Sequence, residues 1–216
     1  FSRGSIIVPV CNIGNELVGL QFIKPNGDKR FLTGTAKRGA FHMLGNVDDD
    51  APLCIAEGYA DAATIYMATQ WPCALAFDAG NLQPVAEALR AKYPDRRILI
   101  CGDDDFAKDV NAGKIKALAA AEAVNGYAIF PDFSSVDERG TDFNDMHIMC
   151  GFMKVKEFLE DFLTQAVLIP QKNADARSDS SGSERDDNFF ASWQAELQKT
   201  EKGKLQANIY NAMLVL

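Results

Sequence analysis

The pattern of apolar and polar residues divides the chain into regions of different periodicity. In the first 50 residues, short apolar and β-branched runs are separated by turn residues, and Asn26-Gly27 is a strong hairpin signal. We therefore predict a small antiparallel β module at the start of the chain. Its expected strands are 5–11, 17–24, 29–33 and 40–44.

From residue 53 the pattern alternates between short, continuous apolar runs and segments of helical periodicity. Strands and helices that alternate in this way are typical of a parallel α/β sheet covered by helices on both faces. Asn81 precedes one of the helical segments and is expected to cap it. The expected strands are 53–56, 73–77, 98–101 and 127–130. The expected helices are 59–67, 82–89, 112–125 and 155–166.

The end of the chain differs from this pattern. Residues 171–188 contain no large apolar side chain, and such a segment cannot bury enough surface to order itself. Residues 189–216 become amphipathic again but are too short for a core of their own. We therefore expect a β subdomain (1–50), an α/β domain (51–170), a disordered linker and the truncated start of a following domain, all within a fragment of a longer polypeptide.

Composition narrows the class of protein. The chain has 216 residues, of which 47% are apolar, and no apolar run is long enough for a membrane span. No signal peptide opens the sequence. The five cysteines are widely spaced and include no Cys-x-x-Cys pair, as expected for free thiols in a reducing compartment. We expect a cytoplasmic globular protein that has no membrane partner.

The net charge of −8 comes entirely from residues 51–170, which carry 10 basic and 18 acidic side chains. Acids follow each expected strand of the α/β domain, and the carboxyl ends of parallel strands meet at one edge of a sheet. Carboxylates that are close together repel one another unless a cation lies between them, and an oxygen-only ligand set favours Mg²⁺ or Mn²⁺. The acids at these strand ends are Glu57, Asp78, Asp103, Asp104, Asp105 and Asp132, with Asp142 and Asp145 soon after.

Each acid has a second interpretation when it is taken alone. Glu57 and Asp61 suit the first turn of a helix, and the aspartates at 103–105 suit a polar turn. Their recurrence at four strand ends favours the metal site over separate local roles.

Several of these segments resemble the motifs of Toprim domains, the catalytic fold shared by bacterial-type primases and topoisomerases. Residues 55–61 resemble the E-G-Y-x-D motif, residues 98–105 the strand followed by D-x-D, and residues 140–145 the third acidic motif of the primase members. Residues 76–82 (A-F-D-A-G-N-L) resemble a segment found in phage and conjugative plasmid primases, which are the nearest resemblance. The similarity covers about residues 5–166.

The resemblance implies a Toprim-like parallel sheet flanked by helices and preceded by the antiparallel β module. It also implies the catalytic core of a DNA primase, which joins ribonucleoside triphosphates into RNA primers on a single-stranded DNA template during phage or plasmid replication. The implied cofactor is Mg²⁺ or Mn²⁺, and the implied partner is a replicative helicase in the same chain or a separate one. Asp142 is a further candidate for the acidic site. The implied metal ligands are Glu57, Asp103 and Asp105, and the implied catalytic set adds Asp61 and Asp145.

The resemblance further implies that basic side chains face nucleotide or template phosphates. Without it, the basic residues of the β module would be interpreted as solvated hairpin charges. Residues 193–214 faintly resemble the opening of a helicase-type domain, and an amphipathic helix explains part of them equally well. The implied nucleotide- or DNA-binding residues are Lys29, Arg30, Lys37, Arg38, Lys108 and Lys114.

Two other functions stay open at this point. A Toprim-type nuclease would use the same carboxylates and metal to hydrolyse a phosphodiester bond. A non-catalytic nucleic-acid-binding module would show no affinity for divalent metal ions. Nucleotide incorporation, strand cleavage and metal binding therefore distinguish the three.

Overall fold

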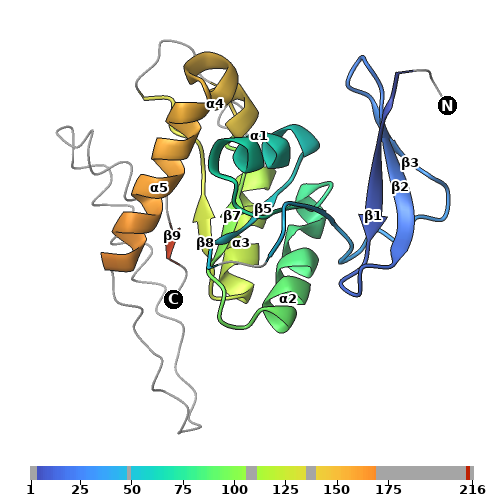
Figure 1. The fold of residues 1–216 in the computed structure, drawn as a ribbon, viewed down its shortest axis with the longest axis horizontal. Coiled ribbons are helices and arrows are strands. Elements are labelled where there is room, and N and C mark those ends of the chain that lie inside the picture. The colour runs from blue at the N-terminus through green and yellow to red at the C-terminus, as the bar shows by residue number, and fades with distance from the viewer. Residues whose placement is uncertain (1–3, 48–49, 106–110, 135–139, 169–212, 215–216) are drawn as a thin grey trace, which may run out of the picture.

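The structure is a computed structural model that describes residues 4–47, 50–105, 111–134, 140–168 and 213–214. A small three-stranded sheet lies beside a six-stranded sheet that is flanked by helices (Figure 1). Among the described helices, none combines the length and apolarity that a membrane crossing requires.

The small sheet is antiparallel, in the order β1 (Ile6–Cys11), β2 (Leu17–Ile23) and β3 (Lys29–Phe31). Successive side chains of a strand point to opposite faces. Phe31 pairs with the buried Gln21 and so shares the inner face, as does Lys29 two residues earlier. Arg30 pairs with Phe22 and therefore lies on the outer face. The two basic residues of β3 thus point in opposite directions.

The large sheet has the order β4-β6-β5-β7-β8-β9. Neighbours from β6 to β8 are parallel, whereas β4 and β9 pair antiparallel at the two edges. The expected antiparallel module and α/β sheet are therefore confirmed, and the large sheet is mixed. Its strands are β4 (His42–Leu44), β5 (Leu53–Ala56), β6 (Cys73–Leu75), β7 (Ile98–Cys101), β8 (Tyr127–Ile129) and β9 (Met213–Leu214).

The sequence assignment of residues 40–44 to the small module is wrong in one respect. These residues supply β4, which pairs with β6 of the large sheet (register Met43 with Ala74). A three-residue strand carries no local signal for its partner, and β6 lies about 30 residues further along the chain. A bridge between Cys11 and Phe41 joins the two sheets at this point.

Helices cover both faces of the large sheet. One apolar cluster joins α2 and α3 to the sheet, and a second joins α1, α4 and α5 to the opposite face (Figure 1). Strands β5 and β7 are buried along their whole length, which explains their continuous apolar sequences. The helices are α1 (Tyr59–Thr69), η1 (Ala79–Asn81, a 3₁₀ turn), α2 (Leu82–Lys92), α3 (Ala112–Ala123), α4 (Phe143–Cys150) and α5 (Phe152–Leu168).

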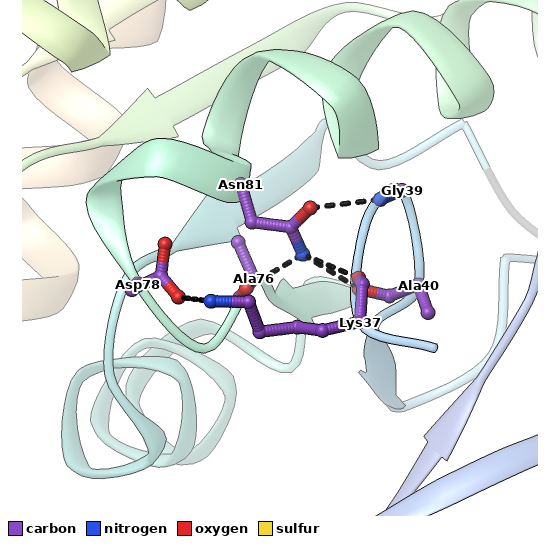
Figure 2. A network of polar contacts seen from close by, with 6 residues as sticks. All are labelled: Lys37, Gly39, Ala40, Ala76, Asp78 and Asn81. Carbon is purple, nitrogen blue, oxygen red and sulfur yellow. Dashed lines mark hydrogen bonds and ion pairs between the residues drawn. The ribbon is translucent and has the colours of Figure 1, made fainter. Parts of the chain in front are cut away.

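Two local expectations about these helices are corrected. The sequence pattern does not predict helix α4, because only Phe143 and Met146 of its eight residues are buried and they give little periodicity. The expected cap of α2 at Asn81 is wrong, since this side chain makes no cap hydrogen bond. It binds instead to backbone groups of residues 37–40 and to Ala76 (Figure 2). The expected linker at 171–188 and the segment after it lie outside the described residues, apart from β9.

Candidate metal-binding active site

Carboxylates from several elements converge at the carboxyl edge of the large sheet. Glu57 follows β5 and Asp103 follows β7, and these two strands are parallel neighbours with Ala56 opposite Cys101. A Cβ added to Gly113, at the start of α3, would lie 3.9 Å from Glu57 Oε2 and 3.6 Å from Asp103 Cβ. The sheet register therefore brings together two acids that lie 46 positions apart in the sequence.

Helices α1 and α4 add two further carboxylates to this edge. Asp61 lies in the first turn of α1 and is only 5% exposed. Its Oδ1 accepts a hydrogen bond of 3.2 Å from the backbone N–H of Asn144, in the first turn of α4. Asp142 is the N-cap of α4, and its Oδ1 accepts a 2.7 Å hydrogen bond from the backbone N–H of Asp145. The hydrogen bond to Asn144 thus links α1 and α4 at the acidic edge.

Burial and mutual repulsion make the ionised forms of these acids unfavourable. Burial, followed by the charge of Asp142, raises the pKa of Asp61 to about 7. Burial, followed by the charges of Asp61, Glu57, Asp142 and Asp105, raises the pKa of Asp103 to about 8. These acids therefore share one electrostatic environment that lacks sufficient positive charge.

Glu57 and Asp142 behave in the same way. Burial raises the pKa of both side chains. For Glu57, a hydrogen bond from the backbone N–H of Ala79 opposes this effect. For Asp142, the hydrogen bond from Asp145 does so. The backbone thus orients both carboxylates without neutralising them.

Lys29 brings a positive charge from the small sheet to the acidic edge. Its charge acts to lower the pKa of Glu57, Asp61 and Asp142. Its Nζ lies 3.8 Å from the position that a Cβ of Gly58 would take, and Asp61 Oδ2 lies 2.8 Å from the same position. A side chain at position 58 would therefore enter the space between the acids and Lys29.

The remaining predicted acids are placed differently. Asp105 contributes charge to both Glu57 and Asp103, as a neighbour in the site would. Asp145 Oδ2 accepts a 2.8 Å hydrogen bond from the backbone N–H of Thr141, so this carboxylate is engaged in the turn before α4. Asp132, at the end of β8, accepts hydrogen bonds from Ser134 and serves a local turn. The acidic site therefore lies at β5 and β7, with less contribution from the end of β8.

The other predicted basic residues are placed differently from Lys29. Arg30 and Lys24 line an open pocket on the outer face of the small sheet. Lys37 forms an ion pair with Asp78, and Arg38 is exposed. Lys108 lies outside the described residues.

Asp104 forms a contact with Asn111 that sequence reasoning missed. Its carboxylate accepts hydrogen bonds from Asn111 Nδ2 (2.7 Å) and Lys114 Nζ (3.2 Å). Asn111 also caps α3 by accepting a hydrogen bond from the backbone N–H of Lys114. Lys114 is therefore engaged with an acid of the 103–105 run. The asparagine directly before the alanine-rich helix was the signal that could have identified this contact.

The donor set fits a hard divalent cation. Oxygen ligands from buried and uncompensated carboxylates are those that Mg²⁺ and Mn²⁺ prefer, and a cation would relieve the repulsion. Within the part of the chain that the structure describes, no three acidic, histidine or cysteine side chains form a ready-made metal centre. Binding would therefore need side-chain adjustment among Glu57, Asp103 and their neighbours.

Comparison with known proteins agrees with this arrangement. Residues 52–152 match the family described as Toprim domain. This segment of the chain is similar to Toprim domains. The match begins just before β5 and ends at the start of α5, so it includes Glu57, Asp61, Asp103, Asp105, Asp142 and Asp145.

Proteins that are similar to this chain include DNA primases. A protein named DNA primase TraC from Escherichia coli is 45% identical over 134 residues, which are 59% of this chain and 13% of the relative. The chain thus spans about an eighth of that relative's length.

Solved structures share the fold at low sequence identity. The RNA polymerase domain of Mycobacterium tuberculosis primase DnaG matches with a TM-score of 0.52 and 16% identity, over 93% of this chain and 71% of that one. A second match is a chain from a structure of bacteriophage T7 lagging-strand DNA polymerase with primase domains of gp4, an RNA/DNA hybrid and dTTP. Its TM-score is 0.51 and its sequence identity is 16%, over 72% of this chain and 78% of that one.

Proposed function

We propose that this chain is the catalytic core of a DNA primase of the phage or plasmid type. It would join ribonucleoside triphosphates into a short RNA primer on single-stranded DNA, with release of pyrophosphate. The observation that carries the proposal is the convergence of Glu57, Asp61, Asp103 and Asp142 into one partly buried carboxylate cluster that lacks sufficient positive charge. Similarity to the protein named DNA primase TraC, at 45% identity, favours primer synthesis over other metal-dependent chemistry.

In this proposal Glu57, Asp103 and Asp105 hold Mg²⁺ or Mn²⁺, with Asp61 and Asp145 completing the acidic surface. The cation would supply the charge that binds the triphosphate and lowers the pKa of the attacking 3′-hydroxyl. The backbone N–H of Ala79 acts to lower the pKa of Glu57 and so favours its ionised form. Positioning and charge, more than covalent chemistry, are the contributions that phosphoryl-transfer enzymes make.

The basic residues have separate roles in the proposal. Lys29 faces the acids and would contact the triphosphate. Exposed Arg38, together with Lys37, would bind template phosphates. Arg30, Lys108 and Lys114 complete the proposed nucleotide- and DNA-binding set. A replicative helicase, in the same polypeptide or separate, is the proposed partner, and the cytoplasm is the proposed location.

The test measures ribonucleotide incorporation by the 216-residue chain on single-stranded DNA with Mg²⁺ or Mn²⁺, and metal binding by calorimetry. Asp103→Ala should lower incorporation by about 100-fold or more, because one carboxylate of the site is lost. Asp95→Ala, at an exposed turn, is the matched control and should change little. Metal-dependent cleavage of the DNA without incorporation would favour the nuclease. Absence of both metal binding and incorporation would favour the non-catalytic module.

A further inference from the structure

The buried side chain of Asn81 connects two distant parts of the chain. It is 2% exposed and lies at the end of η1, after β6. Its Oδ1 accepts a 2.8 Å hydrogen bond from the N–H of Gly39. Its Nδ2 donates to the carbonyl oxygens of Ala40 (2.9 Å), Lys37 (3.1 Å) and Ala76 (2.9 Å), so two N–H groups are shared among three acceptors (Figure 2). We call these four contacts the Asn81 clamp.

The clamp holds the turn at residues 37–40, which connects the small sheet to β4. This turn is closed by a 2.9 Å hydrogen bond from Ala40 N–H to the Lys37 carbonyl, and Gly39 has a left-handed backbone (φ 70°). The turn also carries Lys37, which pairs with Asp78, and the exposed Arg38. Figure 2 shows the ion pair and the clamp side by side on the same turn. Two side chains from the 78–81 segment thus fix one basic turn.

The same segment contacts the acidic site. Ala76, which accepts a hydrogen bond from Asn81, donates its backbone N–H to the carbonyl oxygen of Ala56 (2.9 Å), the residue before Glu57. Phe77, just before this segment, has a left-handed backbone (φ 74°) that a non-glycine residue adopts only when its surroundings enforce it. Its ring packs edge-on against Phe31 of β3, with centroids 5.5 Å apart. Residues 76–81 therefore contact the small sheet, the basic turn and the end of β5, directly before Glu57.

We propose that Asn81 is a positioning residue for template binding, because it holds the basic turn at 37–40 in a fixed place relative to Glu57. The inference rests on the proposed function, in which Arg38 and Lys37 bind the phosphates of single-stranded DNA. With the clamp intact, the turn is ordered before DNA arrives. Without the clamp, DNA must order the turn itself, and the ordering of even one backbone residue lowers the apparent affinity by about 5- to 30-fold.

A positioning role differs from a charge contact in its salt dependence. An Asn81→Ala chain still forms every phosphate contact once the turn is ordered, so its dissociation constant should rise while the slope of log affinity against log salt stays unchanged. Arg38→Gln removes one contact instead and should reduce the magnitude of that slope by about 0.7. The two variants act on the same turn and are distinguished by this one measurement.

The experiment measures binding of a labelled DNA oligonucleotide to the 216-residue chain by fluorescence anisotropy across a salt series in Mg²⁺. Leu89→Ala, in the buried face of α2, is the control for general destabilisation and should leave the dissociation constant within about twofold. Asn81→Ala should raise it by about 5- to 30-fold with the slope unchanged. Asn81→Asp replaces the alanine variant if that variant does not fold. It keeps the acceptor for Gly39 and loses the donors, so it should also raise the dissociation constant.

The outcomes separate this inference from the proposed function. If the wild-type chain binds and Asn81→Ala matches Leu89→Ala, Asn81 is structural only and the inference is wrong. A reduced slope for Asn81→Ala would also overturn it, because a contact would then have been lost. If the wild-type chain binds no DNA at all, the proposed function itself fails.

Discussion

Asp103→Asn should stabilise the metal-free chain near neutral pH and leave it almost unchanged in acid. Folding raises the pKa of Asp103 to about 8, so the folded chain binds this proton more tightly than the unfolded chain does. The contribution of Asp103 to stability is therefore greatest below the unfolded pKa of about 3.9 and falls as the pH rises toward 8. Asparagine keeps the shape of the side chain but cannot ionise, so the Asp103→Asn chain does not lose this stability as the pH rises.

The size of the effect follows from the shift. At pH 7.5 the unfolded chain ionises Asp103 with the ordinary pKa of 3.8, whereas the folded chain keeps its pKa at about 8. This difference lowers the free energy of unfolding at pH 7.5 by about 5 kcal/mol. Asp103 is only partly buried, so solvent screening reduces the expected gain to about 2–4 kcal/mol. At pH 5 the same reasoning gives about 1 kcal/mol or less. The difference between the two pH values is large enough for urea unfolding to resolve.

The measurement compares urea unfolding of wild type and Asp103→Asn in EDTA at pH 5 and pH 7.5. Asp161→Asn, at an exposed position of α5, is the matched control and should shift stability by less than about 0.5 kcal/mol at both pH values. An equal gain at pH 5 and pH 7.5 would contradict the electrostatic origin of the effect. Destabilisation at pH 7.5 would mean that the Asp103 carboxylate is already compensated in the metal-free chain.

Three further outcomes are expected. Added Mg²⁺ should raise the melting temperature of wild type more at pH 7.5 than at pH 5, because protons compete with the ion for the same carboxylates. If Mg²⁺ raised the melting temperature of Asp103→Asn as much as that of wild type, the ion would bind elsewhere. Lys29→Gln should lower stability in EDTA at pH 7.5, since the acids lose a nearby cation, and Mg²⁺ should restore part of it; Arg30→Gln, on the outer face of β3, is the matched control. Gly102→Ala should lower the free energy of unfolding by about 1–3 kcal/mol, because the new Cβ would lie 2.6 Å from the Phe130 ring and 2.7 Å from Ala117 Cβ. Unchanged urea unfolding would show that the ring moves aside freely.

The sequence alone predicts the elements that local pattern determines. The predicted bounds of strands β5 and β7 match the structure to the residue, because both are buried throughout and consist of continuous apolar runs. The sequence places strand β4 in the wrong sheet, since its partner β6 is set by the long-range arrangement and not by three residues of sequence. Helix α4 escapes prediction because few of its side chains are buried and the acidic motif in front of it dominates the pattern.

The sequence likewise predicts only part of the candidate site. Glu57 and Asp103 could be placed from the rule that parallel strands end at one edge, and the structure brings them together there. That Lys29, and not Arg30, points to the inner face needed the register of β3, which the charge pattern does not contain. Three of the four partners of Asn81 lie about 40 positions away in the chain, so its capping signal was misleading.

The pairing of β4 with β6 bears on how this protein can be divided for study. A truncated chain cut to the family match at 52–152 would lack β4, and the backbone groups of Cys73–Leu75 that face it would become an open sheet edge. Open edges recruit other strands and promote aggregation. Such a chain would also lose Lys29 and most of α5, whose buried Leu159 and Phe162 cover one face of the sheet. A unit that keeps both edge strands of the large sheet, β4 and β9, should therefore extend from about residue 5 to residue 214.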